Sequence, residues 1–316
     1  VIHIMKIICS KSSLLKSVNI ALKAVPSKTT MPILECILMD ATTNQIKFTT
    51  NDMELGIETI VEGTIEEKGM VALDAKIFYE IIRRLPDNDV TITTDSNFVA
   101  TITCEKAKFT IPGKAGEDFA YLPVIEKDES LTLSQFTLKE MIRQTIFSIA
   151  VNENNRLMTG ELFEIKDNVL RVASLDGHRI SIRKIELKNP VSDYKMVVPG
   201  KTLIEISKIL SGEAESMVEI SYTNNHIVFE FDNTIVVSRL IEGDYFKIDQ
   251  MLSMIQQADN LLAQLDPNID LNSPTWQAIK QLLARLGITL PEVPSISELR
   301  QQLAAKQTEL QTQRDS

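Results

Sequence analysis

Apolar residues recur every three or four positions in four stretches of the chain, a spacing that predicts amphipathic helices. The four stretches are Leu14–Ala24, Ala75–Leu85, Leu138–Ile149 and Lys201–Leu210. The first ends before Pro26, which has no amide hydrogen to continue a helix. Each helix is followed by segments with a different, shorter period.

These segments are rich in β-branched and alternating residues, and Asn, Asp and Gly turns separate them, so they predict antiparallel strands. In the first half of the chain the predicted strands are Leu34–Asp40, Gln45–Thr50, Leu55–Glu62, Val90–Thr93, Val99–Cys104 and Lys108–Ile111. In the second half they are Thr159–Ile165, Val169–Ser174, Arg179–Glu186, Met217–Tyr222, His226–Phe231 and Thr234–Leu240. Helices that pack on one face of such sheets form an α+β fold.

The two halves of the pattern are copies of one another. Leu14 and Leu138 lie 124 positions apart, and so do Asp52 and Asp176. A repeat of this length is a whole domain and not a solenoid unit. We therefore predict two homologous domains in tandem. Such an arrangement suggests a pseudo-symmetric structural protein and not a catalyst. Their predicted bounds are residues 5–120 and 132–251, with a linker over residues 114–131.

The chain changes character after Met251. Ten glutamines lie in residues 252–316 against four before them, and the single tryptophan, Trp276, lies here. Ser273 followed by Pro274 predicts the start of a helix whose apolar stripe runs to Leu286 and ends at Gly287. Because this segment does not repeat the first two domains, we predict a separate helical module, natural or fused, with a last helix starting at Ser297.

Charge and composition exclude several classes of protein. The formal net charge of −10 argues against nucleic-acid binding by the whole surface, although one basic face remains compatible with it. No run of eighteen apolar residues predicts a membrane helix. The four residues before Met5 resemble an appended leader without a cleavage signal, so we expect no secretion. Cys9, Cys36 and Cys104 lie far apart, as is typical of reduced thiols in a cytoplasmic protein.

Catalysis finds little support in the sequence. His3, His178 and His226 are too scattered to predict a metal site. The chain has no phosphate loop, no nucleophile elbow and no zinc protease motif. We therefore expect a protein that is not an enzyme and uses no metal or cofactor.

The stretch Leu175–Ile180, with the sequence LDGHRI, resembles the bacterial DNA polymerase III beta subunit, the sliding clamp. Shorter stretches in the same order support this resemblance: Met5–Ile7, Met31–Leu34, Arg84–Pro86, Phe119–Pro123, Met196–Lys201 and Leu240–Gly243. It runs from Met5 to about Met251 and implies tandem DNA-clamp-type domains in a ring, with paired helices lining the hole and antiparallel sheets outside. A third domain of this type is not recognisable after Ser253.

The resemblance also implies which residues face DNA. In a clamp, basic side chains on the helices contact phosphates without reading sequence. The candidates are Lys28, Lys76, Arg83, Lys139, Arg143, Lys201 and Lys208. From composition alone these would be ordinary solvated side chains. The resemblance favours contacts with duplex DNA, most of all for Lys28, Arg83 and Lys201.

The run from Asp176 to Arg179 has two interpretations. It is either a tight turn between strands or one wall of the groove with which a clamp binds short peptides of DNA polymerase and the clamp loader. The resemblance favours the groove, whose members would be Met158, Leu175, Gly177, His178, Arg179, Ile180, Phe246, Gln250 and Met251. Phe246 stands where the family usually has proline, and Leu175 where it often has threonine.

Two functions are compatible with these patterns. The first is a sliding-clamp processivity factor that encircles or cradles duplex DNA and tethers the replicative polymerase. The alternative is a clamp-fold assembly or interaction protein, or a fusion, whose helical tail drives self-association without clamp activity. Residues 257–261 are similar to the glutamine-led peptides that clamps bind, but an amphipathic helix is the simpler interpretation of them.

Overall fold

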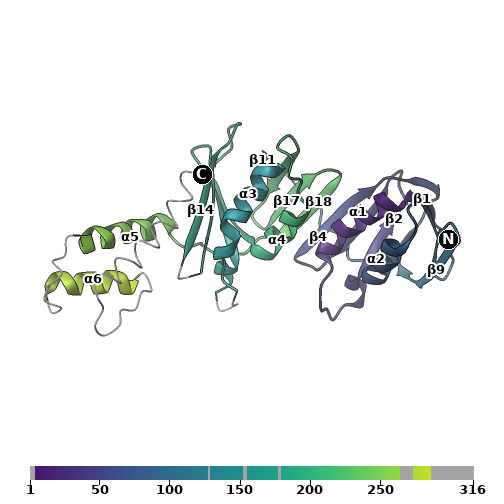
Figure 1. Ribbon diagram of the computed structural model, residues 1–316, viewed down its shortest axis with the longest axis horizontal. Helices are drawn as coiled ribbons and strands as arrows, with labels where there is room; N and C mark the ends of the chain where they lie inside the picture. Colours follow the sequence, from purple (N-terminus) through teal and green to yellow (C-terminus); the bar gives the residue numbers. More distant parts are fainter. Residues whose placement is uncertain (1–3, 127–128, 152–154, 177–178, 264–272, 286–316) are drawn as a thin grey trace. The chain divides into compact units, whose positions relative to one another are not determined.

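The computed structural model describes residues 4–126, 129–151, 155–176, 179–263 and 273–285 (Figure 1). The chain divides into two compact units, residues 1–136 with 205–239 and residues 137–204 with 240–316. Ser297, Leu286 and Gly287, which the sequence places in or beside tail helices, lie outside the described residues. No helix within the described ranges is long and apolar enough to cross a membrane.

Unit 1 contains two antiparallel sheets. The smaller has the order β5 (Thr64–Glu67), β1 (Lys6–Ser10), β7 (Asp89–Thr94), β8 (Val99–Cys104) and β9 (Ala107–Pro112). The larger has nine strands in the order β10 (Lys114–Ala115), β6 (Met70–Asp74), β2 (Cys36–Asp40), β3 (Ile46–Asn51), β4 (Leu55–Val61), β18 (Thr234–Arg239), β17 (His226–Phe231), β16 (Met217–Tyr222) and β11 (Glu129–Ser134).

The nine-stranded sheet is continuous because β4 pairs with β18, so that strands of both sequence repeats share one sheet. Ile57 lies opposite Val236 in this antiparallel register. The hydroxyl groups of Thr59 and Thr234 are buried and lie 2.9 Å apart, within hydrogen-bond distance. A hydrogen bond between two buried hydroxyl groups replaces the hydrogen bonds to water that both groups lose on folding.

Two helices, α1 (Lys11–Ala21) and α2 (Ala75–Arg84), contact each other and the strands of the first repeat. Their apolar stripes are buried in one core, in which the rings of Phe48 and Phe78 meet edge to face at 6.0 Å between centroids. Each helix has a side-chain N-cap: Ser10 accepts a hydrogen bond from the Ser13 amide, and Asp74 accepts one from the Ile77 amide. The predicted helices therefore form for the predicted reason, burial of an amphipathic face.

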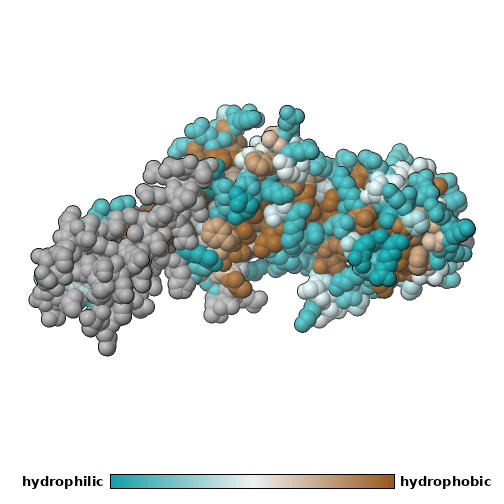
Figure 2. Space-filling model, in the orientation of Figure 1, coloured by the Kyte–Doolittle hydropathy of each residue, from teal (hydrophilic) through white to brown (hydrophobic). Residues whose placement is uncertain are grey.

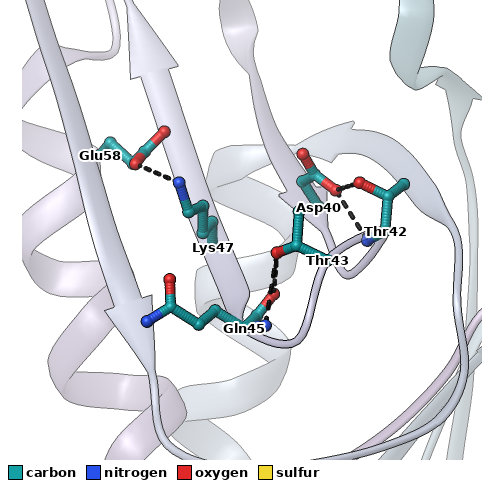
Figure 3. A network of polar contacts seen from close by, with 6 residues as sticks. All are labelled: Asp40, Thr42, Thr43, Gln45, Lys47 and Glu58. Carbon is teal, nitrogen blue, oxygen red and sulfur yellow. Dashed lines mark hydrogen bonds and ion pairs between the residues drawn. The ribbon is translucent and has the colours of Figure 1, made fainter.

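The turn between β2 and β3 is held by its own polar side chains (Figure 3). The Asp40 carboxylate accepts hydrogen bonds from the amide of Thr42 at 2.8 Å and from its hydroxyl at 2.6 Å. On the neighbouring strands, Lys47 and Glu58 form an ion pair at 2.9 Å. A side chain that replaces backbone partners in a turn fixes where the next strand begins, and thus its register.

Unit 2 contains a four-stranded antiparallel sheet in the order β14 (Ile180–Glu186), β13 (Val169–Leu175), β12 (Gly160–Lys166) and β15 (Tyr194–Pro199). Two tail helices belong to this unit, α5 (Ile248–Ala263) and α6 (Pro274–Arg285), and they contact each other. Two further helices, α3 (Gln135–Thr145) and α4 (Gly200–Ile209), have residues in both units.

The helical character of the tail is confirmed for its described part. The Ser273 hydroxyl accepts a hydrogen bond from the Trp276 amide at 3.2 Å, as an N-cap does. Trp276, Ile279 and Leu283 of the predicted stripe are buried. Helix α5 begins at Ile248, so it runs across the boundary predicted after Met251, and residues 257–261 are helical.

The interpretation of residues 114–131 as a linker was wrong at both ends. Lys114–Ala115 form β10, which pairs with β6, and β11 begins at Glu129 and pairs with β16. Strands β1, β5, β6, β11 and β15 were not predicted as strands. Several of them are only four or five residues long, too short for an alternating pattern to emerge.

Gln135, at the start of α3, is a polar hub inside unit 1. Its side chain is fully buried. The amide nitrogen donates to the Met217 carbonyl oxygen at 3.2 Å and to the Asp232 carboxylate at 3.1 Å, and the amide oxygen accepts from the Ser211 amide at 2.7 Å. One side chain thus satisfies groups from three separate segments.

We expect Gln135→Ala to lower the free energy of unfolding by about 2–4 kcal/mol, because three part-buried hydrogen bonds and the packing of a buried side chain are lost. Urea denaturation followed by circular dichroism measures this change. Gln45→Ala is the matched control, since Gln45 is exposed and contributes only backbone atoms to the hydrogen bonds of the turn in Figure 3. Equal stability of the two variants would show that the hub contributes nothing.

Candidate functional site

Five of the predicted groove residues lie in one hydrophobic cluster of unit 2, although they come from distant parts of the sequence. They are Met158, Leu175, Ile180, Phe246 and Met251. The floor of the cluster is buried and consists of Leu162, Ala173, Leu175 and Ile248. Around it the side chains are only partly buried, so this surface can still accept apolar groups.

Each member is placed by ordinary secondary structure. Leu175 ends β13, Ile180 begins β14, and the two are opposite each other in the antiparallel register. Met158 lies in the short 3-10 helix Arg156–Thr159 that leads into β12. Met251 is in the first turn of α5, and Phe246 lies in the segment just before that helix. Two strands, a 3-10 helix and α5 therefore converge on one site.

Arg179 directly precedes Ile180 of this cluster. Its Nε donates to the Asp176 carboxylate at 2.9 Å, and the same carboxylate accepts its backbone amide at 3.2 Å. The guanidinium carbon lies 5.8 Å from the centroid of the Phe147 ring. The Asp176 contacts are those of a tight turn, as one interpretation predicted. Gly177 and His178 lie outside the described residues.

Gln250 is the remaining groove candidate. It is exposed in the first turn of α5. Gln250 is not part of the apolar cluster, although its neighbour Met251 is. Several other members of the cluster, among them Ile182, Tyr245 and Leu252, were not predicted from the sequence. Ile182 could have been found from the alternation of β14, because residues 180 and 182 share a face of the strand.

Tyr245 connects the cluster to the sheet. Its ring meets that of Phe246 edge to face at 5.5 Å, and its hydroxyl donates to the Gly160 carbonyl oxygen at 3.4 Å. Burial, with a smaller contribution from the Glu161 carboxylate, raises the pKa of Tyr245 above its usual range. The phenol therefore stays neutral and remains a hydrogen-bond donor.

Glu161 is an unusual residue of β12. It is fully buried, and within the described residues neither carboxyl oxygen has a hydrogen-bond partner. Burial raises the pKa of Glu161 to about 8. Thr145 opposes this shift only weakly, since its hydroxyl donates to the Met141 carbonyl oxygen at 2.8 Å. The side chain is thus a neutral carboxylic acid near pH 7.

Four charged groups form a second network in unit 2. Arg171 of β13 is buried, and its guanidinium pairs with Glu164 of β12 and with Asp249 of α5. Lys195 of β15 also pairs with Glu164, at 2.6 Å. No sequence pattern predicted this network, because its members are brought together only by strand register and by the docking of α5.

The predicted DNA-contacting residues lie on or beside the helices, and three of them share one feature. Arg83, Arg143 and Lys208 each pair with a glutamate three residues earlier on the same helix, at 2.7 Å. The glutamates are Glu80, Glu140 and Glu205. Hydrogen bonds from Arg143 lower the pKa of Glu140 below its usual value, so this partner stays ionised.

The other four candidates differ in position. Lys76 and Lys201 are exposed in the first turns of α2 and α4, and Lys28 is exposed in the segment between residues 25 and 31. Lys139 is half-buried on α3. Within unit 1, strongly hydrophilic side chains gather over α2 on the face drawn in Figure 2.

The helices are basic although the chain is acidic. Helices α1 to α4 together contain nine basic and three acidic side chains. The rest of the chain contains 24 basic and 40 acidic ones. Positive charge is therefore concentrated on helices α1 to α4, where it favours the binding of an anionic ligand.

Antiparallel sheets, basic helices and a duplicated domain define the class of DNA-clamp proteins. Residues 5–123 match the family of the DNA polymerase III beta subunit, N-terminal domain, and residues 132–247 match its central domain. The chain belongs to the DNA polymerase III beta subunit family.

Its relatives agree in sequence and structure. A crystal structure of a DNA polymerase III beta subunit from Eubacterium rectale is 65% identical, with a TM-score of 0.77, over 83% of this chain and 76% of that one. The Bacillus subtilis sliding clamp structure is 30% identical, with a TM-score of 0.76, over 85% and 76%. The beta sliding clamp of Halalkalibacterium halodurans is 34% identical over 252 residues, which are 76% of this chain and 66% of the relative. The chain thus spans just under two thirds of that relative's length.

Glu161 makes the stability of unit 2 depend on pH. The folded protein binds this proton more tightly than the unfolded chain, whose glutamate titrates near 4.5. The contribution of Glu161 to stability is therefore fully present below pH 4.5, and it declines as the pH rises toward about 8.

We expect Glu161→Gln to flatten this decline, so that the variant gains stability relative to the parent as the pH rises from 5 to 9. Urea denaturation across this range measures the slope. Glu186→Gln, an exposed change on β14, is the control. A parent and variant with parallel pH profiles would contradict the assignment of a neutral Glu161.

Proposed function

We propose that this chain acts as a sliding-clamp processivity factor, which holds duplex DNA through its basic helices and tethers DNA polymerase through a peptide groove in unit 2. The observation that carries the proposal is the convergence of five predicted groove residues on one apolar cluster. A partly exposed apolar cluster built from several segments is the kind of surface that can bind a peptide. The function is one of binding, so the protein is not an enzyme and needs no cofactor.

The charge distribution supports the part of the proposal that concerns DNA. A clamp must attract phosphates without holding any one of them strongly, because strong contacts would stop it from sliding. The ion pairs Glu80–Arg83, Glu140–Arg143 and Glu205–Lys208 weaken the positive field without cancelling it. Lys28, Lys76, Lys139 and Lys201 would supply further phosphate contacts.

The chemistry of the cluster supports the part that concerns the polymerase and the clamp loader. Phe246 and Met251 are partly buried and lie around the buried Leu175, so they offer an apolar surface for large aliphatic or aromatic anchors. Arg179 and Gln250 directly precede Ile180 and Met251 of the cluster, and their side chains are suited to a glutamine side chain or a peptide carbonyl. A short peptide with one glutamine and two large apolar residues fits this arrangement. By the resemblance, Gly177 and His178 would complete the wall.

We expect the chain to bind duplex DNA of any sequence with an affinity that falls steeply with salt. In Lys28→Ala/Lys76→Ala the affinity should fall equally for all sequences, and the slope of log K against log salt should decrease by about 2. Fluorescence anisotropy of labelled duplexes measures both. The control is Lys68→Ala/Lys106→Ala, which removes two exposed lysines in turns between strands, neither of them a candidate for contact with DNA. An equal effect in the control would mean that charge alone matters.

We also expect a labelled peptide with a glutamine and two apolar anchors to bind unit 2. Met251→Ala should weaken that binding roughly tenfold, because truncation of a buried apolar contact removes about 1–2 kcal/mol. Fluorescence polarisation measures the affinity, and Met31→Ala, an exposed methionine outside the cluster, is the control. If the parent chain binds no such peptide, the proposed groove is wrong.

A further inference from the structure

The helix that carries two of the groove candidates is held by a single buried arginine. The Arg171 guanidinium forms two hydrogen bonds with the Asp249 carboxylate, Nη1 to Oδ1 at 2.6 Å and Nη2 to Oδ2 at 3.1 Å. Paired parallel bonds of this kind fix direction as well as distance. Asp249 is the second residue of α5, immediately before Gln250 and Met251.

The network is asymmetric. The Arg171 side chain is 10% exposed and that of Glu164 6%, whereas that of Asp249 is 77% exposed. Glu164 therefore gives Arg171 a buried countercharge that does not depend on Asp249, and Lys195 adds a second cation to Glu164. Asp249 is not needed to keep this charge compensated inside unit 2. What the Arg171–Asp249 pair adds is a connection between the sheet and α5.

The first turn of α5 has an orientation that this connection can set. Ile248 is buried in the floor of the cluster, and Met251 and Leu252 pack against it from positions three and four residues later. These three side chains share one face of the helix. A carboxylate at the helix N-terminus is also favoured by the helix dipole. The hydrogen bonds and charge of Arg171, with Lys184 and Lys166, lower the pKa of Asp249, so it is ionised at neutral pH.

We propose that Asp249 is a positioning residue of the peptide groove: its pair with Arg171 holds the first turn of α5 so that Met251 and Gln250 stay in place as part of the groove wall. This inference rests on the proposed peptide-binding function. It assigns Asp249 no contact with the peptide. Loss of the pair reduces the fraction of molecules in which the wall is assembled, and the apparent affinity falls by that fraction.

Asp249→Asn tests this directly, because asparagine keeps the size of the side chain and removes its charge. Arg171 keeps Glu164, so no buried charge is left alone. We expect the affinity for the labelled peptide to fall roughly two- to fivefold, the range of a partly exposed ion pair. Amide hydrogen exchange in the first turns of α5 should speed up in the same variant, which reports the loosened helix without any peptide. Asp249→Glu, which keeps the charge, should recover part of the affinity.

Asp244→Asn is the matched control. Asp244 is exposed and lies five residues before Asp249, and its substitution changes the net charge by the same amount. Unchanged peptide affinity in Asp249→Asn overturns the proposal, even if the melting temperature falls, because the pair would then only stabilise unit 2. Tighter binding also overturns it, because α5 would then cover the site and compete with the peptide. Absence of binding by the parent chain refutes the groove itself, and the exchange measurement then still decides whether the pair holds α5.

Discussion

Every helix of the duplicated domains must bury one face, and this constraint decides which residues remain for function. In α2 the side chains of Phe78 and Ile82 enter the core, which leaves Arg83 and Arg84 at the surface. In α3 and α4 the residues Leu138 and Leu203 are buried in the same way, and the cations lie on the opposite side of each turn. A helix with one apolar stripe presents its polar residues together. A protein with a negative net charge can therefore have basic surfaces on its helices.

This constraint also explains how much of the structure the sequence could predict. The period of apolar residues located all four helices of the repeats, because burial imposes that period. Strands such as β5, with the sequence TIEE, were not predicted because an exposed edge strand requires almost no alternation of apolar residues. The pairing of β4 with β18 could not be predicted, since it depends on which two edges meet and not on either strand alone. Residues 1–4 and the last helix of the tail lie largely or wholly outside the described residues, so these expectations stay predictions.

The candidate site was predictable in part for a different reason. Leu175, Ile180 and Met251 were placed by resemblance, and the fold brings them together. Tyr245 and Ile182 were missed, although they contact the same cluster. The glutamate partners of Arg83, Arg143 and Lys208 were also missed, even though a spacing of three residues is visible in the sequence and favours helix ion pairs. Resemblance points to positions, whereas the balance of charge around them follows from local chemistry.

Two buried acids of β12, Glu161 and Glu164, show how the sheet of unit 2 is adapted. Glu161 has no partner among the described residues and is neutral near pH 7, whereas Glu164 is paired with Arg171 and Lys195. A buried carboxyl group can avoid the penalty of a lone charge either by keeping its proton or by pairing. Pairing, as in Glu164, brings in Arg171, whose guanidinium also donates hydrogen bonds to Asp249 of α5. Arg171, the one charged residue of β13, therefore adds a polar link between the sheet and α5 to the apolar contacts that Ile248, Met251 and Leu252 make in the cluster.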